Sequence, residues 1–136
     1  VVHAMEQEDF DSWVITKQEE AAKVFEIAGK SWSTDELLEK GKEVYARNCV
    51  ACHQVNGQGI PPAFPSLVGR GIPVGPIEAH IDILLYGRAG TAMQAFGQQL
   101  NAAEIASVVT YTRNAWGNNM KDSVQPKDIN TMMASQ

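Results

Sequence analysis

The pentapeptide Cys49-Val50-Ala51-Cys52-His53 constrains this chain more than any other feature, because it contains both of the chain's cysteines. Two thiols separated by two residues and followed directly by an imidazole match the attachment of haem c: each thiol adds to one vinyl group, and the histidine ligates the iron. We therefore expect one haem c, bound covalently through Cys49 and Cys52, with His53 as an axial ligand.

The same cysteine spacing also occurs in redox-active dithiols and in zinc sites. A redox dithiol usually begins a helix, where the helix dipole lowers the thiol pKa, whereas this pair follows a predicted helix. Zinc would require a second pair of ligands, and outside the pentapeptide the only histidines are His3 and His80. The dithiol and the zinc site remain open as weaker alternatives.

The rest of the chain predicts helices and loops. Ser33 with Glu36, and Asn101 with Glu104, are capping-box patterns that start helices over residues 34–49 and 102–116. A shorter helix is expected over residues 76–86, between a proline and a glycine. No stretch alternates in the way a half-buried strand does, so the predicted fold class is all-α with three main helices.

Length and charge narrow the function classes. The chain has 136 residues, which suits one domain with extra length at its ends. Its net charge of −5 argues against a general nucleic-acid binder, because such proteins carry a surplus of basic residues. Residues 1–39 hold ten acidic residues against three lysines, so the charge is concentrated there. No run of about 18 apolar residues occurs, so we expect no membrane span in this piece.

A haem that only transfers electrons needs a second axial ligand. Met93 lies in a loop of small residues, 90–97, between the two later helices, from which it can reach the opposite face of the haem. His80 on the middle helix is the competing candidate, although a helical histidine is more often a partly exposed polar residue. The remaining methionines are expected to be surface or tail residues: Met5, Met120, Met132 and Met133.

Several segments together resemble a class I cytochrome c domain. They are residues 49–53, residues 59–65, residues 91–97, and a final helix with Tyr111 and Trp116. The resemblance covers residues 34–118. More narrowly, residues 87–97 and 105–118 are similar to the haem c domain at the C-terminus of subunit II of caa-type cytochrome c oxidases.

The resemblance implies a division of the chain. Residues 1–20 look like the terminal stub of the copper-binding domain of that subunit, residues 21–33 like a linker, and residues 119–136 like a C-terminal tail. The copper ligands of that family are expected upstream, so the copper role is not carried onto His3 or Met5. The domain would wrap its helices and loops around one haem.

The resemblance also implies roles around the haem. The carbonyl of Pro62 would accept a hydrogen bond from the imidazole of His53, with Pro61 and Pro65 as alternatives. Gly41 and Tyr45 would meet Tyr111 at a helix crossing. The remaining assignments are Arg70 and Arg88 beside the haem propionates, and Phe64, Leu67, Tyr86 and Phe96 packed against the haem.

The implied function is that of a one-electron carrier, which is not an enzyme by itself. Electrons would come from a donor cytochrome or from quinol:cytochrome c oxidoreductase and pass to the dinuclear copper site of the same subunit, beside oxidase subunit I. The location would be periplasmic or on the outer face of the cytoplasmic membrane, anchored through an N-terminal part absent here. A free-standing or differently fused periplasmic cytochrome c is the alternative, and a haem enzyme or gas sensor is a further one.

Overall fold

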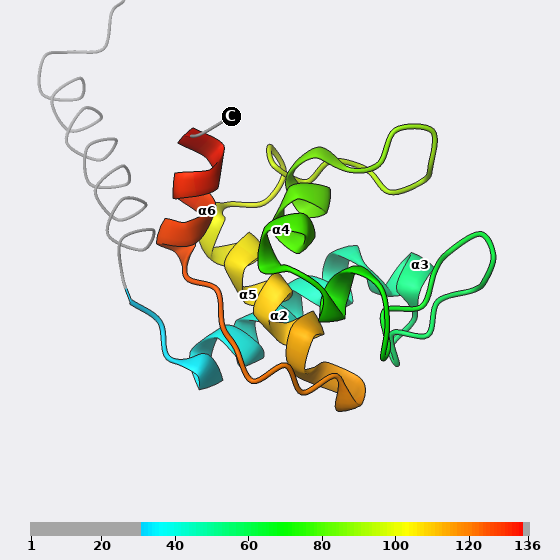
Figure 1. Ribbon diagram of the computed structural model, residues 1–136, viewed down its shortest axis with the longest axis horizontal. Helices are drawn as coiled ribbons and strands as arrows, with labels where there is room; N and C mark the ends of the chain where they lie inside the picture. The colour runs from blue at the N-terminus through cyan, green and yellow to red at the C-terminus, as the bar shows by residue number, and fades with distance from the viewer. Residues whose placement is uncertain (1–30, 135–136) are drawn as a thin grey trace, which may run out of the picture. The chain divides into compact units, whose positions relative to one another are not determined.

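The computed structural model describes residues 31–134 of the chain and is helical in that range (Figure 1). The helices are α2 (Thr34–Asn48), α3 (Val50–His53), α4 (Ile77–Tyr86), α5 (Ala102–Asn114) and α6 (Pro126–Ala134). Between residues 31 and 134 the backbone pairing includes one isolated bridge, Ile60 with Phe64, and no strand. The expected all-α class is confirmed, whereas the predicted stub and most of the predicted linker lie outside the described residues.

Both predicted capping boxes are present. The Ser33 hydroxyl accepts a hydrogen bond from the backbone N–H of Glu36 at 3.1 Å, and the Glu36 carboxylate accepts one from Ser33 in return. Asn101 and Glu104 form the same reciprocal pair at 2.8 and 3.0 Å. Each box satisfies two of the N–H groups that a helix start leaves without partners, which fixes where α2 and α5 begin.

The helices α2 and α5 cross in backbone contact at Gly41. A Cβ atom on Gly41 would overlap the carbonyl oxygen of Ser107 and lie 2.6 Å from Cβ of Tyr111. The absence of a side chain therefore allows the two helices to approach this closely. One turn further along α2, the rings of Tyr45 and Tyr111 lie with centroids 5.6 Å apart. The predicted meeting of Gly41, Tyr45 and Tyr111 is confirmed.

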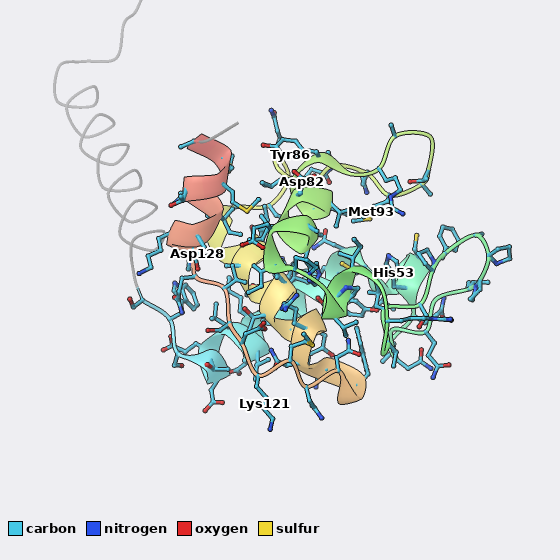
Figure 2. All side chains as sticks on the ribbon, in the orientation of Figure 1. His53, Asp82, Tyr86, Met93, Lys121 and Asp128 are labelled. Atoms are coloured by element: carbon cyan, nitrogen blue, oxygen red, sulfur yellow. The ribbon has the colours of Figure 1, made fainter. Side chains whose placement is uncertain are left out.

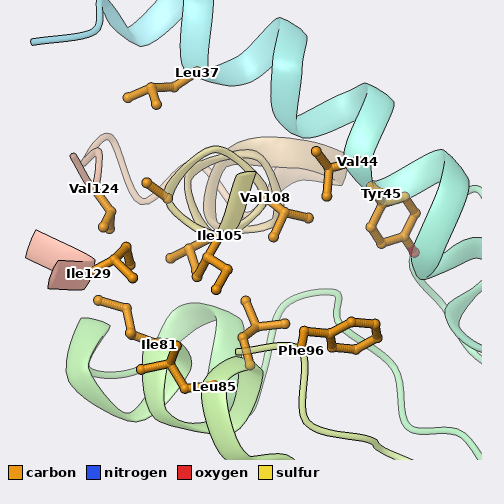
Figure 3. Packing of buried hydrophobic residues seen from close by; sticks show 13 residues of the cluster. Leu37, Val44, Tyr45, Ile81, Leu85, Phe96, Ile105, Val108, Val124 and Ile129 are labelled. Atoms are coloured by element: carbon orange, nitrogen blue, oxygen red, sulfur yellow. The ribbon is translucent and has the colours of Figure 1, made fainter. Parts of the chain in front are cut away.

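The hydrophobic core lies on both sides of α5, which is seen end-on between α2 and α4 in Figure 3. Leu37 and Val44 face it from α2, and Ile81 and Leu85 face it from α4. A fully buried side chain of this kind contributes about 1.5–3 kcal/mol by its removal from water. Helix α5 therefore packs against both α2 and α4 and fixes their positions in the domain.

The segment after residue 118 is not the tail that the sequence led us to expect. It contains α6, and Val124 and Ile129 are 1% and 0% exposed within the core. The guanidinium of Arg113 donates to both carboxylate oxygens of Asp122, at 2.9 and 2.7 Å. Pro126 begins α6, at the one end of a helix where proline is tolerated. Two apolar anchors and one ion pair therefore hold the segment on the domain.

Candidate haem site

The two cysteines lie at a break between two helices. Helix α2 ends at Asn48, and Cys49 leaves the helical conformation while its N–H still donates to the Tyr45 carbonyl at 2.9 Å. Helix α3 then carries Cys52 and His53, and the His53 N–H donates to the Cys49 carbonyl at 2.9 Å. This single turn places both thiols and the imidazole on one short stretch of backbone, with no disulfide between the thiols.

The environment of Cys49 argues against a redox-active dithiol. Burial, with a smaller contribution from the neighbouring Cys52, raises the pKa of the Cys49 thiol to about 11. A reactive thiol requires the opposite shift, because the thiolate is the nucleophile. Over residues 31–134, no cluster of three His, Cys, Asp or Glu side chains has the geometry of a metal site. The arrangement therefore fits covalent attachment better than either alternative.

The imidazole of His53 has a fixed orientation. Its Nδ1 lies 3.0 Å from the carbonyl oxygen of Pro65. Because a carbonyl only accepts, Nδ1 carries the proton and donates it, which leaves the lone pair on Nε2 available to an iron atom. This is the tautomer that a haem ligand needs, so the site fits the cofactor that the cysteine pattern predicts.

The prediction that Pro62 provides this carbonyl is wrong, and one of its alternatives, Pro65, takes the place. The physical reason is a reversal of the chain. Ile60 and Phe64 exchange backbone hydrogen bonds of 2.8 and 2.9 Å, and this pairing brings Pro65, the next residue, back towards His53. A Cβ atom on Gly59 would lie 2.6 Å from the Pro65 oxygen. Glycine at this position is what lets that carbonyl reach His53.

The segment from residue 54 to residue 69, called here the proximal loop, is closed on itself. The Gly59 N–H donates to the His53 carbonyl at 2.9 Å, and the Leu67 N–H donates to the Gly57 carbonyl at 2.6 Å. With the Ile60–Phe64 pair, these bonds make a compact hairpin without a regular strand. The loop therefore holds its Pro65 carbonyl in place by its own backbone as well as by its surroundings.

Met93 lies in residues 87–97, called here the distal loop. The Arg88 N–H donates to the Met93 carbonyl at 3.0 Å, and the Phe96 N–H donates to the Leu84 carbonyl at 2.8 Å. Gly87 has φ +69°, and a Cβ atom there would lie 2.7 Å from the Met93 carbonyl oxygen. The Met93 side chain is half-buried and packs against the core.

Some predicted site residues come together and others do not. Cys49, Leu67 and Met93 all pack against the core cluster to which Phe96 belongs. Figure 2 shows His53 and Met93 at the end of the domain away from Asp128 on α6. Phe64 is half-buried, and the remaining predicted residues are exposed: Pro62, Arg70, Tyr86 and Arg88.

His80, the competing ligand, is engaged elsewhere. It is 5% exposed rather than partly exposed as expected, and its Nε2 lies 3.1 Å from the Thr112 hydroxyl. Its Nδ1 is buried with no hydrogen-bond partner in the described structure. Burial, followed by the positive charge of Arg113, lowers the pKa of His80 to about 3, so the imidazole is neutral. His80 therefore joins α4 to α5 inside the domain.

Two residues beyond α5 contact the proximal loop without having been singled out for it. The indole Nε1–H of Trp116 donates to the Val55 carbonyl at 3.0 Å. The amide of Asn118 donates to the Leu67 carbonyl at 2.8 Å and accepts from the Gly69 N–H at 2.7 Å. The sequence places Trp116 at the end of the last predicted helix and in the family resemblance, but no sequence signal points to a role for Asn118.

Comparison with known families decides the identity of the domain. A family model described as cytochrome c oxidase, cbb3-type, subunit III, matches residues 26–111. The chain belongs to this cytochrome c family. Cytochrome c-552 of Thermus thermophilus is 40% identical to it over 95 residues, which are 60% of this chain and 71% of that protein. The chain is therefore a cytochrome c electron-transfer domain that carries one haem c, bound covalently through Cys49 and Cys52.

Other relatives are larger proteins. The gluconate 2-dehydrogenase cytochrome c subunit of Pantoea cypripedii is 31% identical over 132 residues, 89% of this chain but 28% of that subunit. The cbb3-type oxidase subunit CcoP of Azospirillum brasilense is 37% identical over 92 residues, 62% of this chain and 31% of that subunit. The chain thus spans less than a third of these two relatives. None of the helices described here is long and apolar enough to cross a membrane.

Proposed function

We propose that this domain is a one-electron carrier in which His53 and Met93 are the two axial ligands of the haem iron. The observation that carries the proposal is the orientation of His53: Nδ1 donates to Pro65, so Nε2 is presented with its lone pair at the end of the domain where Met93 also lies. When bound, the haem supplies one exchangeable electron at its iron.

The chain's own residues determine what that electron can do. The hydrogen bond to Pro65 fixes the tautomer of His53 and increases the electron donation of its imidazole. The Met93 thioether is a softer ligand that favours the ferrous state and raises the reduction potential. With His53 and Met93 both bound to the iron, the haem would offer no position to oxygen or peroxide and would exchange one electron without bond chemistry.

Replacement of Met93 by alanine tests this ligation. Met93→Ala should lose the weak near-infrared band of methionine-ligated ferric haem and should bind cyanide or imidazole readily. Met120→Ala and His80→Gln are the controls, because Met120 lies beyond α5 and His80 is held by Thr112. A wild-type protein that is high-spin in the ferric state at neutral pH would overturn the electron-carrier proposal in favour of a haem enzyme or gas sensor.

We infer further that the natural partners are respiratory. The resemblance of residues 87–97 and 105–118 to caa-type subunit II supports a domain that takes electrons from a donor cytochrome or from quinol:cytochrome c oxidoreductase and passes them to dinuclear copper in the same polypeptide, beside oxidase subunit I. Residues 1–20 and 21–33 would then be the copper-domain stub and the linker. Covalent haem c implies a periplasmic or outward-facing location, with the anchor in the N-terminal part of the parent.

A differently fused cytochrome is the second candidate. It is favoured by one observation, the match of 89% of the chain to a gluconate 2-dehydrogenase cytochrome c subunit. The coding sequence upstream of Val1 separates the two candidates. A loop with paired cysteines, a histidine and a methionine there supports the copper-containing oxidase subunit, and its absence supports a differently fused cytochrome.

The predicted contacts of the haem edge belong to the same proposal. Arg70 and Arg88 are both exposed, which suits cations beside propionates at the surface. Phe96 and Leu67 would pack against the porphyrin from the side of the core, and Phe64 and Tyr86 from the loop and helix end.

A further inference from the structure

The turn that follows α5 contacts both legs of the proximal loop. On the first leg, the indole of Trp116 donates its Nε1–H to the Val55 carbonyl at 3.0 Å. The ring also covers Gly57, where a Cβ atom would lie 2.5 Å from a ring carbon. Trp116 adopts φ +54°, a left-handed conformation that is unfavourable for a bulky side chain and is maintained here by these contacts.

On the second leg, the side-chain amide of Asn118 makes three hydrogen bonds. Its Oδ1 accepts from the Gly69 N–H at 2.7 Å, and its Nδ2 donates to the carbonyls of Leu67 and Thr112, each at 2.8 Å. Thr112 is part of α5, so this one amide connects the end of the proximal loop to the helix on which the core is built.

Each anchored carbonyl belongs to a residue two positions after one partner of the hydrogen bond between His53 and Pro65. Val55 lies two residues after His53, and Leu67 lies two residues after Pro65. Between these anchors is the 3.0 Å hydrogen bond from His53 Nδ1 to the Pro65 carbonyl. Displacement of either leg would therefore move one of the two partners of that bond.

We propose that Trp116 and Asn118 are positioning residues for His53: they hold the two legs of the proximal loop so that the Pro65 carbonyl stays within hydrogen-bond distance of Nδ1. The proposal rests on the function of His53 as an axial ligand. A weaker Nδ1 hydrogen bond makes the imidazole a poorer donor, which stabilises the ferric state less and raises the reduction potential.

The chain offers a matched control for Asn118. Asn114 also makes three side-chain hydrogen bonds, donating to the carbonyls of Thr110 and Asp122 at 2.8 and 3.0 Å and accepting from the Lys121 N–H at 2.9 Å. These three partners, Thr110, Asp122 and Lys121, lie outside the proximal loop. Asn118→Ala and Asn114→Ala therefore each remove three side-chain hydrogen bonds, at positions four residues apart. Only Asn118→Ala removes bonds to the proximal loop.

The test compares both variants as haem-loaded proteins. In the ferrous protein, NMR measures the exchange of the His53 Nδ1 proton with solvent, and redox titration measures the reduction potential. Asn118→Ala should accelerate that exchange about tenfold and shift the potential upward, because the loss of one half-buried polar anchor is worth roughly a factor of ten in an equilibrium. Asn114→Ala should leave both quantities unchanged, although both variants lower the unfolding temperature.

Equal exchange rates in the two variants, or an unchanged rate in Asn118→Ala, would overturn the proposal. Trp116→Phe is a second test that removes the bond to Val55 and part of the ring that covers Gly57 while keeping an aromatic side chain; it should also accelerate exchange. The proton exchange reports on His53 alone. A failure of Met93 to bind iron would therefore be seen separately, in the near-infrared band of every variant.

Discussion

The proximal loop (residues 54–69) carries the Pro65 carbonyl that orients His53, the distal loop (residues 87–97) carries Met93, and the two loops are held by different means. Side chains from other elements hold the proximal loop: the Tyr45 hydroxyl donates to the Gln54 carbonyl at 2.5 Å, and Trp116 and Asn118 hold the two legs. Main-chain bonds to the end of α4 hold the distal loop: Phe96 N–H to Leu84, and Gly97 N–H to the Leu85 carbonyl at 3.2 Å.

The difference shows how each loop depends on sequence. The last carbonyls of a helix have no partner within it, and the distal loop satisfies two of them at the end of α4. The turn also requires the glycine at position 87, and the Thr91 hydroxyl bonds the Arg88 carbonyl and the Met93 N–H within the loop. The proximal loop binds one carbonyl at the end of the short helix α3 through Gly59, and side chains distant in sequence hold its two legs.

The largest expected effect comes from the glycine on which the distal loop depends. Gly87→Ala adds both the strain of φ +69° and a Cβ atom 2.7 Å from the Met93 carbonyl oxygen. We expect a loss of several kcal/mol in unfolding free energy, roughly 1 from the backbone conformation and the rest from the clash, together with a weakened methionine band. Denaturant unfolding and the ferric near-infrared spectrum measure the two effects.

Gly90→Ala is the control for that variant. Gly90 also has a positive φ, +79°, but a Cβ atom there meets nothing within 4 Å. It should cost only about 1 kcal/mol and leave the methionine band intact. Similar behaviour of the two variants would show that the main chain around Met93 is not what holds the distal loop.

The next effect concerns the side-chain contact between His80 on α4 and Thr112 on α5. The folded protein has a His80 pKa of about 3 against about 6.5 unfolded, so unfolding takes up a proton between these values. Stability from this group is complete above pH 6.5 and decreases as the pH falls towards 3, by on the order of 1 kcal/mol per pH unit. Asp122 opposes the shift and Arg113 adds to it.

His80→Gln removes that titration while keeping an N–H group that can reach Thr112. Its unfolding free energy should therefore depend less steeply on pH between 4 and 6.5 than that of the wild type. Denaturant unfolding at several pH values measures this, with His53 present in both proteins. Parallel pH profiles would contradict the assignment of acid sensitivity to His80.

A smaller effect is expected from one bond of the proximal loop. Burial raises the pKa of Tyr45 above its usual range, so its phenol is a donor at any ordinary pH. Tyr45→Phe removes the hydrogen bond to the Gln54 carbonyl and should lower the unfolding free energy by about 1 kcal/mol. The ring contacts with Tyr111 and Trp116 remain, so Tyr45→Ala should lose clearly more. Equal losses in the two variants would mean that the hydroxyl contributes little.

The smallest effect is on electron exchange with a partner. Residues 48–69 and 89–103, which include the attachment segment and most of both loops, contain no Asp, Glu, Lys or Arg. Screening acts on charges, so the second-order rate of reduction by a small charged donor that reacts at this uncharged surface should change less than about twofold between low and physiological salt. Stopped-flow kinetics measures the rate; a steep salt dependence would indicate that distant charges orient the partner.

The helix starts and the attachment segment could be predicted because their signals are local. Ser33 with Glu36, and Asn101 with Glu104, form capping boxes within a single helical turn. Gly41 predicts that another backbone approaches its helix closely, without identifying which one. The prediction of Pro62 failed because the choice among three nearby prolines depends on the Ile60–Phe64 pairing. That pairing is invisible in a segment rich in glycine and proline.

The C-terminal segment could not be predicted for a different reason. Its apolar anchors, Val124 and Ile129, are too few to make a periodic pattern, and Arg113 finds its partner Asp122 only after the chain has turned. The turn itself places Trp116 and Lys121 at positive φ, which neither residue type favours, and also Asn119, whose residue type tolerates it. Contacts made in the folded state override the local preference at these positions.

The side chain of Gln125 forms two hydrogen bonds to the backbone of Trp32, its Oε1 accepting from the N–H at 2.8 Å and its Nε2 donating to the carbonyl at 2.9 Å. Tension along the chain ahead of residue 32 is therefore divided between α2 and the segment that leads into α6, because Gln125 is bonded to the Trp32 backbone. Figure 2 places His53 and Met93 at the end of the domain away from Asp128 on α6. The Gln125–Trp32 pair therefore directs tension from the chain ahead of residue 32 to a part of the domain that is remote from the proposed iron ligands.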